Sequence, residues 1–145
     1  MKIKSDVFVN NGKIPTEYTC DGKGIQLPLR IYDVPEGAKS LALIMDDPDV
    51  PSGDFVHWVI WNIDPKVLII GDGNVPVGAV EGYTSLGKPG FVAPCPPSGV
   101  HRYNFKLYAL DVILSIPKSS NKADLVQAMN QHIIDSAILV GLYGK

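Results

Sequence analysis

The sequence predicts a mostly β protein with one α-helix near its C-terminus. Glycine and proline are frequent, with 14 and 12 of the 145 residues, so turns interrupt the chain throughout. The apolar runs between the turns are short and rich in β-branched and aromatic residues, which is typical of strands. Apolar residues recur at helical spacing in only one late segment. No unit repeats along the chain, which argues against a repeat array.

Strands are predicted wherever a β-prone run lies between turn residues. The runs span residues 6–9, 29–32, 40–45, 56–63 and 102–110, with 67–70 as a further candidate and 137–143 as a terminal strand. The helix is predicted over residues 121–134, because Asn121 can cap it and Asp124 follows three residues later. Residues 76–99 hold too much glycine and proline for regular structure, and so long a loop is usually functional. We expect this loop to cover a ligand pocket.

The composition fits one soluble domain over residues 1–145, with 46% hydrophobic and 19% charged residues. A formal charge of −2 leaves no clustered basic surface for nucleic acid. The N-terminus lacks the apolar run of a secretory signal, and no stretch approaches the roughly 20 apolar residues that span a bilayer. We therefore predict a cytoplasmic protein. Cys20 and Cys95 stand in no metal-binding spacing, so two free thiols are the simplest interpretation and a disulfide between them is the alternative.

A first polar cluster precedes the apolar run that begins at Val59. Asp47 and Asp49 flank Pro48, whose fixed φ holds the two carboxylates in fixed relative directions. A solvated turn is the plain alternative, since Asp and Pro are ordinary turn residues. His57 and Trp58 follow in the next predicted strand, where successive side chains face opposite sides. One of them can therefore face a pocket while the other enters the core.

A second polar cluster, residues 95–103, precedes the apolar run that begins at Phe105. Its Pro96-Pro97-Ser98-Gly99 turn leads into His101-Arg102-Tyr103. Strand alternation places His101 and Tyr103 on one face and Arg102 on the other. In the plain alternative Tyr103 packs as a core aromatic and Arg102 makes a surface salt bridge. Together the two clusters favour a pocket for a small polar ligand.

These clusters make the chain resemble the phosphatidylethanolamine-binding protein family, which includes the Raf kinase inhibitor proteins. It is most similar to the small bacterial and archaeal members. The matching runs keep the family order and lie at residues 14–15, 18–22, 40–44, 47–49, 57–63, 95–103, 107–111 and 140–144.

The resemblance implies two packed antiparallel β-sheets, a Greek-key β-sandwich with a C-terminal helix. It implies a non-enzymatic protein without metal or cofactor, whose pocket binds a small anion such as a phosphate-like group or a phospholipid headgroup. It also implies a cis peptide bond between Val50 and Pro51. The ligand-binding residues that it implies are Asp47, Asp49, Pro51, Phe55, His57, Cys95, Pro96, His101 and Tyr103.

Acidic residues suit an anion pocket when they support histidines. A carboxylate beside an imidazole favours the imidazolium, so an aspartate can hold His57 or His101 charged while that ring and Tyr103 donate to the ligand. An aspartate can also accept from the ammonium of a zwitterionic headgroup. Which aspartate supports which histidine stays open at this stage.

The chain departs from the family pattern around the pocket. Residues 92–94, Val-Ala-Pro, replace Gly-Gly-Pro, and Thr84-Ser85 replaces Asn-Asp or Asn-Ser. The turn before His101 is short, and residues 26–29, Gln-Leu-Pro-Leu, replace Ser-Pro-Pro-Leu. Because glycine lets a backbone approach an anion closely, these changes bear on ligand choice.

The same residues suggest three other functions. A metal site built on the aspartates and histidines lacks HxH and HExxH spacing, and a hydrolase built on Ser98 lacks the GxSxG elbow. The main alternative is a protein inhibitor of a serine protease or kinase that acts through the loop at residues 84–97. The sequence leaves open the physiological ligand, any protein partner, and the choice between monomer and homodimer.

Overall fold

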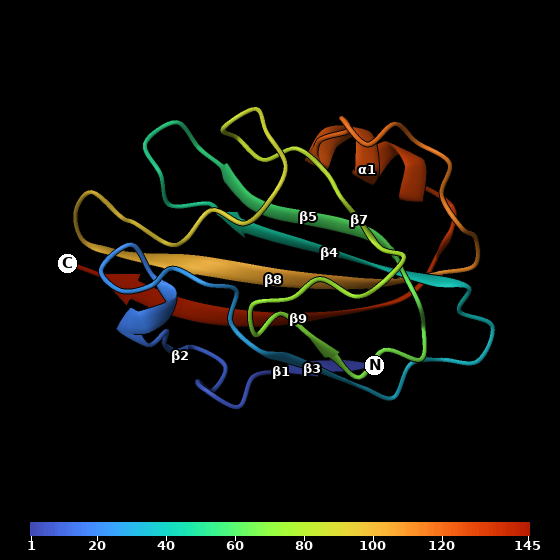
Figure 1. Cartoon of the computed structure of the whole chain (residues 1–145), viewed down its shortest axis with the longest axis horizontal. Helices are drawn as coiled ribbons and strands as arrows, with labels where there is room; N and C mark the ends of the chain where they lie inside the picture. The colour runs from blue at the N-terminus through green and yellow to red at the C-terminus, as the bar shows by residue number, and fades with distance from the viewer.

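A computed structural model describes all 145 residues and contains two β-sheets and one α-helix (Figure 1). The large sheet has the strand order β2-β9-β8-β4-β5-β7, and the small sheet has the order β1-β3-β6. The large-sheet strands are β2 (Gly12–Lys13), β4 (Ser40–Asp47), β5 (Phe55–Ile63), β7 (Val80–Glu81), β8 (Val100–Leu110) and β9 (Ile133–Gly144). The small-sheet strands are β1 (Lys2–Lys4), β3 (Leu29–Tyr32) and β6 (Ile69–Ile70), and α1 spans Lys122–Met129.

The large sheet is buried on both faces, with the small sheet on one side and α1 on the other (Figure 1). Strand β4 lies at its centre, and all eight of its residues are buried. Alternate β4 side chains enter different cores: Leu43 joins the cluster between the sheets, and Ile44 joins the cluster under α1. Burial on both faces explains why β4 is a nearly continuous apolar run.

The predicted mostly β class, with two sheets and a late helix, is confirmed. One pairing differs from the expected antiparallel pattern, because β2 pairs with β9 in parallel. The strand predicted over residues 6–9 is wrong, since the first strand is β1 and Phe8 is a buried loop residue. Phe8 packs on Phe105 with the ring centroids 6.0 Å apart, so its apolar signal came from the core and not from a strand.

The helix starts as predicted and ends earlier. Asn121 and Asp124 form a reciprocal capping box, each side chain accepting the other's backbone N–H. The helix ends at Met129 and not at residue 134, because Gln131 adopts a φ of 67° and the chain then enters β9. Ile133 pairs with Leu110 in the sheet. Sheet pairing of this β-branched segment therefore overrides its helical spacing.

Two local predictions are wrong. The structure contains no cis peptide bond, so Val50–Pro51 is trans. Pro51 instead occupies the second position of a turn that the Gly53 N–H closes on the Val50 carbonyl at 2.9 Å, where a trans proline fits. The cysteines are not free, because Cys20 and Cys95 form a disulfide. Distance along the sequence did not reveal that folding brings their two loops together.

The structure has no helix with the length and apolar character of a membrane span.

Candidate functional site

A cavity of about 240 Å³ opens where β4 ends and where β5 and β8 begin. Seven of the nine predicted ligand-binding residues line it, while Asp49 and Pro51 do not. The lining residues are Asp47, Val50, Phe55, His57, Val92, Ala93, Cys95, Pro96, Pro97, His101 and Tyr103. A larger groove of about 520 Å³ between β1 and β9 contains no histidine and no acidic residue among its lining. The smaller cavity is therefore the candidate site.

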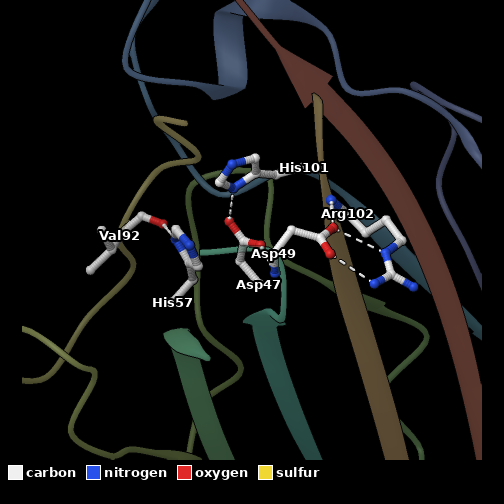
Figure 2. A network of polar contacts seen from close by, with 6 residues as sticks. All are labelled: Asp47, Asp49, His57, Val92, His101 and Arg102. Carbon is white, nitrogen blue, oxygen red and sulfur yellow. Dashed lines mark hydrogen bonds and ion pairs between the residues drawn. The ribbon is translucent and has the colours of Figure 1, made fainter. Parts of the chain in front are cut away.

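Asp47 and His101 form a buried pair in the lining of this cavity (Figure 2). Asp47 Oδ2 lies 2.6 Å from His101 Nδ1, and the two side chains are 2% and 8% exposed. A carboxylate accepts here, so Nδ1 carries the proton and Nε2 is left for other partners. The second oxygen, Oδ1, accepts the Asp49 N–H at 2.8 Å. Asp47 therefore orients the His101 ring and sets the tautomer that carries its proton on Nδ1.

A β-bulge turns His57 toward the cavity. Met45 pairs with Trp58 and Asp46 pairs with Val56, so His57 has no partner in the register. Consequently His57 lines the cavity while the adjacent Trp58 enters the core between the sheets. This is the division that the sequence predicted, with one of the two side chains at the cavity and the other in the core. Simple alternation could not anticipate the extra residue.

A hydrogen bond between its Nδ1 and the backbone of Val92 holds the His57 ring in place (Figure 2). Its Nδ1 lies 2.7 Å from the Val92 carbonyl oxygen, which can only accept, so Nδ1 is the protonated nitrogen. Burial lowers the pKa of His57 below its usual 6.5, against opposing contributions from the Val92 hydrogen bond and the Asp47 charge. His57 is therefore neutral at pH 7, with Nε2 as an acceptor.

Tyr103 completes the polar part of the cavity. Its side chain is almost fully buried, and its ring meets the His57 ring edge-on with centroids 5.3 Å apart. Burial, aided by the charge of Asp47, raises the pKa of Tyr103 above its ordinary value. The phenol consequently keeps its proton and remains a hydrogen-bond donor at physiological pH.

Asp49 was predicted to bind ligand, and the structure assigns it elsewhere. It accepts from Arg102 three times: from the backbone N–H at 2.8 Å, from Nε at 3.0 Å and from Nη2 at 2.7 Å (Figure 2). This bidentate pair closes the loop after β4 onto β8. Arg102 therefore makes the surface salt bridge that the sequence suggested as the alternative to a binding role. This salt bridge positions the loop that contains Val50.

The sequence pattern of the phosphatidylethanolamine-binding protein family matches residues 4–144. The chain belongs to this family. A UPF0098 protein of Methanothermobacter thermautotrophicus is 48% identical over 100% of this chain and 99% of its own length. A crystal structure of a phosphatidylethanolamine-binding protein homologue from Chlamydia trachomatis superposes with a TM-score of 0.96 at 43% identity, covering 99% of this chain and 97% of the other. An Escherichia coli structure described as a new member of the mammalian family has a TM-score of 0.90 at 29% identity, covering 99% and 98%.

Four lining residues of this phosphatidylethanolamine-binding family member were not predicted individually: Val50, Val92, Ala93 and Pro97. The last three lie in the loop of residues 76–99, and they occupy the cavity wall. The signal that located them was the density of proline and glycine in the loop. That signal identifies a segment, but it does not say which side chains face inward.

We expect Asp49 to titrate far below an ordinary aspartate. The hydrogen bonds from Arg102 lower its pKa to about 2. Because this folded-state pKa is depressed, the pair stabilises the fold above the unfolded value near 3.9, and the effect is lost as pH falls through about 2. Carboxyl carbon NMR over acidic pH measures this directly. Arg102→Gln should raise the Asp49 pKa toward 3.9, and an unchanged pKa in that variant would contradict the assignment.

Proposed function

We propose that this protein binds a singly charged phosphate ester, such as the phosphodiester of a phospholipid headgroup, without catalysing a reaction on it. The observation that carries the proposal is the convergence of Tyr103, His57 and the Asp47–His101 pair on one small cavity. Tyr103 supplies a permanent donor, and each histidine has its Nε2 free of the contacts that hold Nδ1. Phosphate oxygens accept such donors strongly, especially when the donor is charged.

The charge count favours a single negative charge on the ligand. The cavity lining contains no lysine or arginine, and the Asp47 carboxylate faces the His101 imidazole, so the cavity holds no excess positive charge before a ligand enters. An incoming anion makes protonation of His57 more favourable, because an opposite charge nearby stabilises the imidazolium. The neutral His57 then takes up one proton on Nε2, and this N–H donates a hydrogen bond to the anion. Binding is thereby coupled to uptake of one proton.

The rest of the cavity wall is apolar and suits the carbon skeleton of a headgroup. Phe55 packs against His57 with the two rings tilted and their centroids 4.8 Å apart, and Val50, Val92 and Pro97 line the same cavity. Such surfaces bury methylene groups but offer no further charge. A glycerol or ethanolamine carbon next to the phosphodiester would contact them.

Two features support binding without covalent chemistry. Cys95 is bonded to Cys20, so it offers no thiolate nucleophile at the cavity. Ser98 is not among the lining residues, although it lies near His101 in the sequence. A hydrolase based on Ser98 would require that hydroxyl beside the reacting group. Turnover of a phosphodiester that Ser98→Ala abolishes would overturn this part of the proposal.

The direct test is titration with glycerophosphoethanolamine, a phosphodiester that stays singly negative near neutral pH. Tyr103→Phe and His57→Ala should each weaken binding about tenfold or more, since a hydrogen bond to a charged group contributes about 1.5 to 3 kcal/mol. His132→Ala serves as the matched control, because His132 pairs with exposed Asp111 away from the cavity. If the probe does not bind the unmodified protein, the proposal fails and the protein-inhibitor interpretation takes precedence.

Binding should strengthen as pH falls from 8 toward 5. The pKa of His57 in the free protein lies below 6.5, so at pH 8 the ligand must induce protonation, whereas at lower pH that cost diminishes. At pH values above the pKa of His57, we expect each unit by which the pH falls to lower the Kd for glycerophosphoethanolamine by up to about tenfold. Calorimetry in buffers of different ionisation enthalpy would count the proton taken up. Retention of the full pH dependence in His57→Gln would contradict this assignment to His57.

A further inference from the structure

The disulfide lies in the wall of the proposed binding cavity. Five of the eleven lining residues come from the short segment 92–97, which includes Cys95. Cys20, its partner, belongs to a separate loop and does not line the cavity. We propose that the Cys20–Cys95 disulfide is a redox latch that holds this wall in its binding conformation and that its reduction weakens ligand binding. This inference rests on the proposed function and adds its regulation.

Few backbone hydrogen bonds hold this wall. Val92 is held at one end, where its N–H donates to the His57 carbonyl at 2.9 Å. Beyond it, the Pro94 carbonyl accepts from Cys20 N–H at 3.1 Å, and the next backbone bond joins Gly99 to Lys145 at 3.4 Å. Prolines at positions 94, 96 and 97 offer no N–H groups. Between residues 93 and 98, the one backbone hydrogen bond to another segment is therefore the bond from Cys20, while Pro94 and Pro96 are held by burial alone.

The Cys20 side of the latch is anchored independently of the disulfide. Within its loop, Thr19 Oγ1 donates to the Thr16 carbonyl at 2.7 Å, and Gly22 N–H donates to the Thr19 carbonyl at 3.0 Å. The Tyr143 hydroxyl, on β9, donates to Asp21 next to Cys20. Tyr143 also pairs in the sheet register with His101 of the cavity. The disulfide consequently ties the wall, which has a single backbone hydrogen bond to another segment between residues 93 and 98, to a loop that is attached to β9.

Both cysteines are exposed, so a dithiol reductant can reach the bond. One thiolate of the reductant attacks a sulfur of the disulfide, forming a mixed disulfide and releasing the other protein sulfur as a thiolate. The second thiol of the reductant then displaces the remaining protein sulfur. The reductant becomes a cyclic disulfide, and the protein gains two electrons and two protons as two thiols. The polar residues of the cavity are unchanged by this exchange.

The test compares glycerophosphoethanolamine binding to oxidised protein and to protein reduced with dithiothreitol. Reduction should weaken binding about tenfold, because the ligand must then order the side chains of the wall. Cys20→Ser and Cys95→Ser should each bind as weakly as the reduced protein and should not respond to dithiothreitol. Amide hydrogen exchange should accelerate at Val92 on reduction, while the β4–β8 amides remain protected.

The outcomes separate this inference from the proposed function. Absence of binding to the oxidised protein contradicts the proposed function itself. Equal binding to oxidised and reduced protein contradicts only the latch. Weak binding in Cys95→Ser with normal binding in Cys20→Ser would show a direct contact with Cys95 and would overturn the latch. Global loss of amide protection on reduction would do the same, because the disulfide would then support the whole fold and not the wall.

Discussion

Replacing Asp46 with alanine is expected to destabilise the protein by about 3 kcal/mol, because it leaves two lysine ammonium groups without their shared partner. The Asp46 carboxylate is 1% exposed and accepts from Lys106 Nζ at 3.0 Å and from Lys122 Nζ at 2.8 Å. Burial alone would raise the pKa of Asp46, and the two lysines more than reverse this, so the net pKa is lowered. Denaturation in urea at pH 7 measures the loss.

Asp54→Ala is the matched control for this prediction. Asp54 accepts from the same Lys122 at 2.9 Å, but its side chain is 41% exposed. An exposed pair of this kind contributes at most about 1 kcal/mol. Equal destabilisation by the two variants would contradict the role given to the burial of Asp46.

The pKa of Asp46 is lower in the folded protein than in the unfolded chain. Its contribution to the free energy of unfolding is therefore present above pH about 4 and is lost as pH falls through the pKa of the folded state.

Gly71→Ala is expected to destabilise the protein by about 3 kcal/mol or more, through overpacking and backbone strain together. Gly71 has a φ of 91°, and a Cβ there would lie 2.1 Å from the Leu27 carbonyl oxygen. That oxygen belongs to the backbone of a fully buried residue, so it cannot move aside easily. Thermal or chemical denaturation of the variant tests the prediction.

Gly73→Ala separates the two causes. Gly73 has a similar φ of 82°, but a Cβ there would meet nothing within 4 Å. Its substitution should therefore cost only the left-handed backbone penalty, about 1 kcal/mol. The difference between the two variants measures the clash with Leu27. If both variants lose the same stability, the close approach at Gly71 is not important.

Asp46 and Asp47 are adjacent in the sequence and serve different parts of the molecule. Strand alternation directs Asp46 to the α1 side, where it meets the lysines, and Asp47 to the cavity side, where it meets His101. Asp46→Ala should therefore lower stability while leaving anion binding close to normal in the folded fraction. Strand alternation acts in the same way on β8. Arg102 faces outward and binds Asp49 in the loop after β4, while His101 and Tyr103 on either side of it face the cavity.

The fold class and the segments that supply the cavity could be predicted from the sequence alone. Short β-prone runs between glycines and prolines identify the main strands, and the polar clusters at residues 46–58 and 95–103 contribute most of the lining. These features are local: turn chemistry, strand propensity and capping depend on neighbours along the chain. The capping box at Asn121 could be predicted for the same reason.

The pairing of the polar side chains, in contrast, became known only from the folded structure. Asp47 accepts a hydrogen bond from His101, and Asp49 accepts hydrogen bonds from Arg102. His57 donates a hydrogen bond to the Val92 carbonyl. Several other pairings were compatible with the sequence. The bulge that turns His57 inward and the closure of the disulfide also depend on contacts between distant segments. The physical reason is that such pairings depend on the register between strands and on how loops fold over them. A single sequence contains no local signal for either.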